Sequence, residues 1–220
     1  MRTLFSLSLS IILLQLLPLG QSPPEPEEPK SPVKGWWMVS YFAVAPTQYS
    51  PAGKGIIKAE SLGTRSSLFK NVKEKEQDFS ILSWRWKISN VVRSAIETRK
   101  DRFDAAARVM VVFGKEETFT LFGGGAGPSG PRIEYIWASR PSVGQVFDHP
   151  GDKNCRVFVL ESGNRKAGQW VEERRNIRKD FKTAFGEDPP NVGAIGIETD
   201  TDQSNESVTA YYAEPRLTKK

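Results

Sequence analysis

The chain has 220 residues, a formal net charge of +5 and a pI near 9.3, with 31 basic and 26 acidic residues dispersed along it. Its one cysteine, Cys155, excludes an intramolecular disulfide, and one cysteine with one histidine excludes the usual four-ligand zinc sites. A Ser-His-Asp or Cys-His catalytic group would have to use His149, which lies in the loop-like segment FDHPGD, so this chemistry is not favoured.

The amino end is typical of an export signal. Arg2 precedes an almost wholly apolar run, Leu4 to Gly20, which is short for a membrane-spanning helix. We predict a signal peptide at residues 1–22, a linker rich in Pro and Glu at 23–34, and a folded domain at 35–220. The protein is therefore expected to be secreted or periplasmic, and to contact a membrane only through the signal segment before cleavage.

Short apolar or alternating runs, separated by Gly, Pro, Ser and Asn clusters, predict many strands. One helix is predicted after Asn176, because Ile177, Phe181 and Phe185 recur at spacings of four before Gly186. The fold class that follows is all-β: an antiparallel β-sandwich of the jelly-roll or galactose-binding-like type with one short helix. The predicted strands are Met38–Phe42, Ile56–Ala59, Ser67–Val72, Phe79–Ser89, Ala106–Phe113, Ile133–Ala138, Arg156–Glu161, Gly168–Ile177, Gly193–Asp200 and Val208–Arg216.

The stretch LSWRWKI alternates strictly between two faces. Trp84 and Trp86 share one face with Leu and Ile, which indicates the core, and Arg85 then lies on the opposite face of the sheet. The run ending in Phe113 places Arg108 off the core in the same way. If both strands belong to one sheet, the two arginines share a surface, where they either pair with cross-strand carboxylates or bind a ligand.

An acidic counterpart is GIETDTDQSNES, in which Glu198, Asp200 and Asp202 recur at every second position. On a continuing strand these three carboxylates share one face and repel one another unless something neutralises them. The alternatives are the arginines on a common outer sheet surface, a calcium ion, or water at a strand end. An EF-hand is excluded, since Asn205 replaces its glycine and Tyr211 its bidentate glutamate.

Two further segments are candidate binding elements. Trp137 is a possible stacking surface for a ligand, although it shares its strand face with Ile133 and Tyr135 and so also fits the core. FGGGAGPSG, from Phe122 to Gly130, lacks the Gly-Lys-Ser/Thr ending of a phosphate-binding loop and is predicted to be a flexible hairpin connection.

An ordered set of motifs resembles the DUF3047 family of uncharacterised bacterial proteins: LSWRWKI, DAAARVMVVF, IEYIWAS, RVFVLESG, WVEERRNIRKDFKTAFG and IGIETDTDQS. The resemblance implies a secreted or periplasmic jelly-roll-like sandwich similar to carbohydrate-binding modules, and no known activity. The chain departs from the family pattern at Gln203 and Ser204, after the acidic strand, and at Glu214, where an aspartate is usual. The second departure weakens the calcium alternative.

The favoured function is non-catalytic binding of a glycan or another envelope ligand, with Arg85, Arg108, Trp137, Glu198, Asp200 and Asp202 as the candidate ligand-binding residues. One alternative is a glycan hydrolase that uses a carboxylate pair drawn from these acids or from Glu172 and Glu173. Another is an envelope adaptor that binds protein through a sheet edge. Nucleic acid is not an expected partner of an exported chain, and no cofactor other than calcium is indicated. The sequence does not indicate an oligomeric state.

Overall fold

The computed structural model describes residues 31–114 and 130–219. The predicted signal peptide, most of the linker and most of the Phe122–Gly130 loop lie outside this part of the chain. Within it, no helix has the length and apolar character needed to cross a membrane. Val33, which falls in the predicted linker, is 8% exposed and packs in the main core, so ordered packing begins before residue 35.

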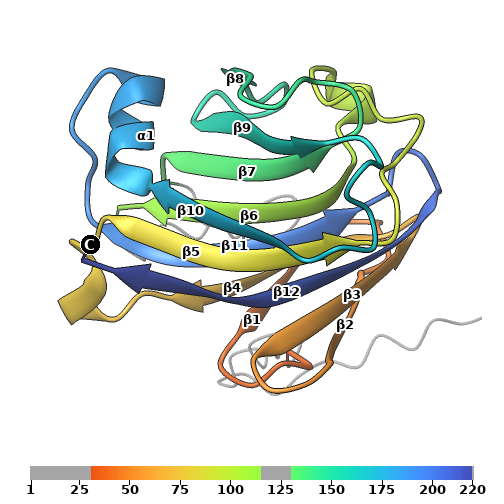
Figure 1. Cartoon of the computed structure of the whole chain (residues 1–220), viewed down its shortest axis with the longest axis horizontal. Coiled ribbons are helices and arrows are strands. Elements are labelled where there is room, and N and C mark those ends of the chain that lie inside the picture. Colours follow the sequence, from red (N-terminus) through yellow and green to blue (C-terminus); the bar gives the residue numbers. More distant parts are fainter. Residues whose placement is uncertain (1–30, 115–129, 220) are drawn as a thin grey trace, which may run out of the picture.

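Two β-sheets pack face to face, as Figure 1 shows, with the helix α1 at one end of the sandwich. The seven-stranded sheet has the strand order β1-β4-β11-β6-β7-β9-β8, and the five-stranded sheet has the order β10-β5-β12-β3-β2. The strands of the larger sheet are β1 (Trp37–Ser40), β4 (Arg65–Asn71), β6 (Ala105–Phe113), β7 (Arg132–Ala138), β8 (Val146–Asp148), β9 (Cys155–Ser162) and β11 (Val192–Asp200). Those of the smaller sheet are β2 (Gln48–Pro51), β3 (Ile56–Leu62), β5 (Ile81–Ile88), β10 (Val171–Asn176) and β12 (Ser207–Thr218).

This arrangement confirms the predicted fold class, and each of the ten predicted strands is present. Two strands were missed, Gln48–Pro51 and Val146–Asp148. Both are short strands at sheet edges, where the backbone pairs with a neighbouring strand on one side only. Such a strand can form without the alternation of apolar and polar residues that marks a longer strand in the sequence. One strand pair also departs from the antiparallel pattern, since β7 and β9 run parallel. Two one-turn helices, η1 (Glu74–Glu76) and η2 (Lys100–Arg102), lie in the connections.

The main core lies between the two sheets and contains the two tryptophans of LSWRWKI. Trp84 is 3% exposed and Trp86 is fully buried, with their rings edge to face at 5.5 Å. Trp84 also contacts Tyr135 of the other sheet, with ring centroids 5.3 Å apart. Each buried indole removes a large apolar area from water. The two tryptophans are therefore part of the core, as the alternation predicted.

The helix α1 (Ile177–Phe185) closes one end of the sandwich and has the predicted boundaries. The side chain of Asn176 accepts a hydrogen bond from the amide of Lys179 at 3.0 Å, and Gly186 ends the helix with a φ of 78°, which glycine adopts at little cost. Phe181 is buried against Phe113 of the larger sheet, with ring centroids 4.5 Å apart.

The outer face of the seven-stranded sheet is also largely buried. All residues of β6 and β11 are buried on both sides of the sheet. A second, smaller apolar cluster on the outer side includes Val39, Phe69, Met110 and Val112. Charged residues that alternate away from the main core on these strands are consequently not exposed to solvent.

Candidate functional site

A charge cluster lies on the outer side of the seven-stranded sheet, and we define it as Arg65, Arg108, Glu198 and Asp200. Antiparallel pairing places Arg108 of β6 opposite Glu198 of β11, and Arg65 of β4 opposite Asp200. Arg108 is fully buried; one of its terminal nitrogens donates to Glu198 and, at 2.8 Å, to Asp200 Oδ2. The sequence correctly associated Arg108 with the acidic strand, but it did not indicate Arg65.

Arg65 of the cluster, and the neighbouring hydroxyl groups of Tyr41 and Ser67, also contact the two carboxylates. Arg65 Nε lies 3.5 Å from Glu198 Oε1 and 3.4 Å from Asp200 Oδ2, while the Tyr41 hydroxyl donates to Glu198 Oε2 at 3.0 Å. Ser67 donates to the same oxygen. Burial raises the pKa of Glu198, but the guanidinium groups of Arg65 and Arg108 more than offset this and hold it at about 2.

The carboxylates of Glu198 and Asp200 are neutralised within the protein, because each forms ion pairs with both Arg65 and Arg108. Arg108 also donates to the carbonyl of Phe103, and its guanidinium lies over the Phe103 ring at 4.5 Å. Removing one partner of a buried ion pair costs folding free energy, because the other charge is left buried and unpaired. In the intact cluster, the charged groups already contact one another and few of their hydrogen-bonding atoms remain for a ligand. The arrangement favours a structural role for Arg108, Glu198 and Asp200.

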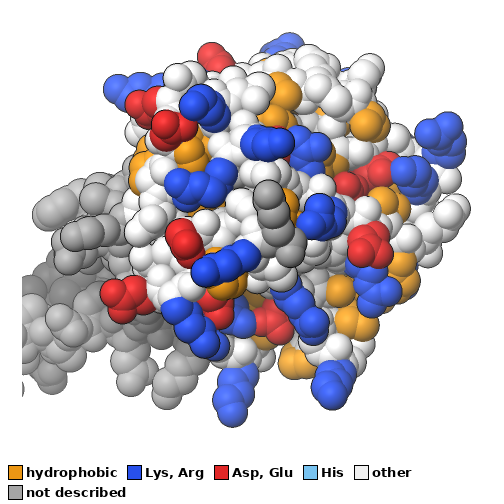
Figure 2. All heavy atoms as spheres, turned by 60° about the vertical axis from the view of Figure 1, so that its left-hand side comes forward, with side chains coloured by type: hydrophobic (Ala, Val, Ile, Leu, Met, Phe, Trp, Pro, Cys, Tyr) orange, Lys and Arg blue, Asp and Glu red, His pale blue; other side chains and the backbone are white. Residues whose placement is uncertain are grey.

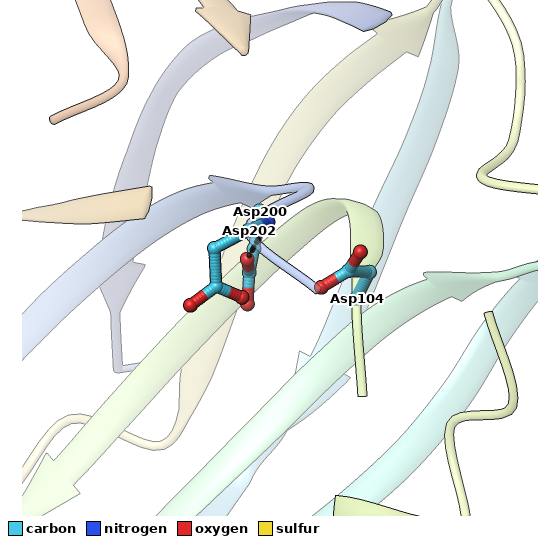
Figure 3. Close-up of side chains that lie close together, drawn as sticks. All are labelled: Asp104, Asp200 and Asp202. Atoms are coloured by element: carbon cyan, nitrogen blue, oxygen red, sulfur yellow. Dashed lines mark hydrogen bonds between the residues drawn. The ribbon is translucent and has the colours of Figure 1, made fainter. Parts of the chain in front are cut away.

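Asp202 does not continue the acidic strand. β11 ends at Asp200, and Asp202 lies in the following turn with its amide donating to Asp200 Oδ1 at 3.1 Å. Figure 3 shows the side chains of Asp200 and Asp202 side by side. The side chain of Asp104, the residue just before β6, lies close to them. The expectation of three carboxylates along one strand face is therefore wrong at Asp202, because the turn changes the direction of the chain.

These three aspartates are the group in the described part of the chain that resembles a cation site, with one oxygen from each within 4.8 Å of the others. Burial and then the Asp200 carboxylate raise the pKa of Asp202 to about 7. Calcium takes six to eight oxygen ligands. Asp104 already accepts bonds from the amides of Gln203 and Ser204, and Asp200 Oδ2 accepts from Arg108. Calcium binding here stays a prediction.

Trp137 lies in the core and is not a stacking surface. It is fully buried, its indole nitrogen donates to the carbonyl of Gly163 at 3.1 Å, and its ring lies 5.9 Å from that of Trp86. Trp137 shares one face of its strand with Ile133 and Tyr135, and both of these are also fully buried. The sequence had left this core position open as the alternative.

Arg85 belongs to the other sheet. It lies on β5 of the five-stranded sheet, and Arg108, Glu198 and Asp200 lie on the seven-stranded one, so the core separates them. The hypothesis that these residues share one outer surface is wrong. Alternation showed which side chains point away from the core, but it cannot show which of the two sheets a strand joins.

The outer face of the five-stranded sheet is built differently, and its first feature is an aromatic row, which we define as Trp170, Lys87 and Tyr211. Lys87 and Tyr211 are register partners on β5 and β12, and Trp170 directly precedes β10. Trp170 is 38% exposed, and its ring centroid lies 6.4 Å from that of Tyr211. The Lys87 ammonium lies 4.4 Å from the Tyr211 centroid and 5.3 Å from that of Trp170.

A groove of about 400 Å³ lies beside the aromatic row, lined by Arg85, Glu172, Arg216, Lys54 and their neighbours. Across the sheet, Arg85 pairs with Glu172 on one side and Ala213 on the other, and Ser83 pairs with Arg216. Ser83 and Ala213 have small side chains, so the middle of this surface is hollow while longer side chains rise around it. Trp170, Tyr211 and Arg216 were not predicted as ligand contacts. Trp170 lies just before a strand and Arg216 follows a break in register, so strand alternation does not place either of them.

One carboxyl group with a strongly altered pKa lies on neither outer face. Glu173 of β10 pairs with Trp84 and lies on the core side of the strand; burial and then Glu161 raise its pKa to about 7. A carboxyl group with such a pKa can serve as a general acid. Its position between the sheets keeps it away from the aromatic row and the groove.

Comparison with solved structures found several matches. The xyloglucanase domain of NopAA, a type three effector from Sinorhizobium fredii in complex with cellobiose, has a TM-score of 0.45 and 13% identity and covers 84% of this chain and 94% of its own. A family 30 carbohydrate-binding module of a cellulosomal cellulase of Clostridium thermocellum has a TM-score of 0.40 and 10% identity, covering 86% and 92%. A family 11 carbohydrate-binding module from Clostridium thermocellum, in complex with a β-1,3-1,4-mixed-linked tetrasaccharide, has a TM-score of 0.38 and 11% identity, covering 87% and 92%.

Comparison with curated protein sequences found no match. The expected family, in contrast, is found over most of the chain: residues 34–216 match the family described as "Protein of unknown function (DUF3047)". This range includes all twelve strands except the last two residues of β12, together with α1. The chain therefore belongs to the DUF3047 family.

Proposed function

We propose that this protein is a non-catalytic, exported binding module, and that it binds a glycan on the outer face of its five-stranded sheet. The observation that carries the proposal is the aromatic row beside the groove, in which Trp170 is exposed and Lys87 and Tyr211 are partly exposed. Sugar rings present C–H faces that pack on aromatic side chains, and their hydroxyl groups need nearby donors and acceptors. Trp170 and Tyr211 supply the first requirement, and Arg85, Lys87 and Glu172 supply the second.

The contrast with the buried charges supports this location. Each member of the charge cluster on the seven-stranded sheet already has an oppositely charged partner within the cluster. Arg85 and Glu172 are register partners, yet no ion pair or hydrogen bond joins them among the described residues. Charged groups without an ion-pair partner can bind a ligand without first breaking an ion pair.

Binding to a panel of soluble polysaccharides, measured by affinity electrophoresis and then by calorimetry, tests the proposal. Trp170→Ala is expected to weaken binding by about 2 kcal/mol, roughly 30-fold in Kd, as for an aromatic residue at the centre of an interface. Phe42→Ala is the matched control, because Phe42 is also an exposed aromatic residue, at 84%, but follows β1 of the other sheet. Equal effects of the two substitutions would contradict the proposed surface.

The same panel tests the alternative of a carboxylate-dependent hydrolase. Release of reducing sugar by the purified protein, lost on Asp200→Asn in a variant that remains folded, would overturn the non-catalytic proposal. We expect no release, because Asp200 is fully buried and hydrogen-bonded to Arg108.

A further inference from the structure

The outer face of the five-stranded sheet carries an excess of unpaired positive charge. Lys54, Arg85, Arg174 and Arg216 are exposed, and among the described residues none of them forms an ion pair or a side-chain hydrogen bond. Two acidic side chains line the groove, Glu172 and Glu214, and the second is paired with Lys70. Figure 2 shows Lys and Arg side chains spread over the end of the molecule that carries α1, with Asp and Glu side chains among them.

A β-bulge is responsible for the position of Arg216. Ala213 pairs with Arg85 and Arg216 pairs with Ser83, so β12 contains one residue more than β5 over this interval. Without the extra residue, strict alternation would point Arg216 to the same side as Tyr212, which is fully buried. The bulge instead brings Arg216 to the outer face, diagonally across from Arg85 and about 7–8 Å from it between strands.

Two arginines at diagonal positions on neighbouring strands, beside the small side chains of Ser83 and Ala213, suit an anionic group on a sugar. Guanidinium binds carboxylate and sulfate oxygens through paired, charge-assisted hydrogen bonds, which a neutral hydroxyl cannot reproduce. The groove adjoins the aromatic row, since Arg85 lies 5.5 Å from the Trp170 ring centroid. A sugar stacked on Trp170 can therefore extend an acidic substituent toward Arg85 and Arg216.

We infer that the bound glycan is acidic, with a carboxylate or sulfate group of the sugar lying between Arg85 and Arg216. This inference rests on the proposed glycan-binding function and specifies its ligand class. It differs from a general attraction of a basic protein for polyanions, because it assigns the preference to two residues of one groove.

The test compares pairs of polysaccharides that differ only in charge, at an ionic strength of about 0.15 M, where distant charges are screened. Polygalacturonate and its methyl ester test the carboxylate source, and dextran sulfate and dextran test the sulfate source. At least one acidic member is expected to bind about 10-fold or more tightly than its neutral partner. Arg85→Gln combined with Arg216→Gln is expected to remove this preference, so that the acidic polysaccharide binds no more tightly than its neutral partner.

Lys153→Gln combined with Lys179→Gln is the matched control, because it removes the same charge from exposed positions that do not line the groove. Retention of the preference in this variant supports the inference, and an equal loss overturns it. Equal binding of acidic and neutral polysaccharides, weakened by Trp170→Ala, overturns the inference but leaves the proposed function standing. Binding of no polysaccharide overturns both. Single-stranded DNA that competes as well as the acidic polysaccharide also overturns the inference.

Discussion

The two outer faces of the sandwich use charged residues in opposite ways. On the seven-stranded sheet, Arg108 is fully buried and its guanidinium group is matched by Glu198 and Asp200. On the five-stranded sheet, Arg85 is exposed and has no ion pair among the described residues. On its own strand, each arginine lies on the face opposite to the apolar side chains of the core, which include tryptophans on β5 and valines on β6. Local pattern thus identifies a residue that leaves the core, while tertiary structure decides whether that residue meets a carboxylate or solvent.

The difference has an energetic basis. A buried guanidinium group loses its hydration and requires carboxylate partners. Removing it leaves those carboxylates buried without a partner, which lowers the free energy of unfolding. An exposed guanidinium keeps its hydration and contributes little to folding. Substitutions on the two faces should therefore separate stability from binding.

The largest effect is expected for Arg108→Met, which leaves Glu198 and Asp200 buried with one guanidinium partner in place of two. The free energy of unfolding should fall by about 3–5 kcal/mol. The matched substitution Arg85→Met should change it by less than about 0.5 kcal/mol. Urea unfolding followed by tryptophan fluorescence measures both, and similar losses for the two variants would remove the proposed contrast.

A smaller effect, dependent on pH, is expected for Glu198→Gln. The folded-state pKa of Glu198, about 2, lies below its ordinary value of 4.5, so its stabilising contribution is present above pH 4.5 and is lost as the pH falls toward 2. The variant should lose about 1.5–3 kcal/mol at pH 7. It should also show a shallower decline of stability between pH 4.5 and 2 than the wild type; parallel pH profiles would contradict this account.

The opposite sign is expected for Asp202→Asn. The folded-state pKa of Asp202, about 7, lies above its ordinary value, so the folded protein favours the protonated carboxyl group. The stability that this group contributes is present below about pH 4 and is lost as the pH rises through 7. The variant should therefore melt at a higher temperature than the wild type at pH 8 and at a nearly equal one near pH 4. Thermal unfolding at both pH values measures this, and repeating it with calcium and with a chelator tests the cation alternative. Calcium that raises the melting temperature of the wild type alone would support a metal site.

The smallest effect on stability is expected for Ala213→Leu, which fills the groove of the five-stranded sheet from its floor. Ala213 is partly exposed on the outer face, so the free energy of unfolding should change by less than about 0.5 kcal/mol. Glycan binding should nevertheless be lost, because the added side chain occupies the hollow. Unchanged binding in calorimetry would show that the ligand does not enter this groove.

Much of the fold could be predicted from local signals. The alternation of Leu82, Trp84, Trp86 and Ile88 predicted their burial, and the caps at Asn176 and Gly186 predicted the limits of α1. These signals succeed because a side chain's direction on a strand, and a helix end's hydrogen bonds, depend on residues adjacent in sequence. The two short edge strands lacked such a signal.

The candidate site was less predictable. Arg108, Glu198 and Asp200 were correctly associated, because adjacent strands bring opposite charges into register. Arg85 was wrongly joined to them, and Trp137 was considered for a surface that it does not reach. Trp170 and Arg216 gained their positions from a strand start and a β-bulge, which no simple alternation encodes.

The amino-acid sequence by itself determined that this chain builds strands, which side chains face the core and where its one predicted helix begins and ends, since these follow from backbone geometry over a few residues. Only the tertiary structure decided that Arg108 is buried in ion pairs while Arg85 lines an open groove. The reason is that the order of the strands and the extra residue in β12 depend on packing between segments that are far apart in the chain. Several strand pairings fit the local sequence pattern equally well, and the free energy of the whole sandwich selects one of them.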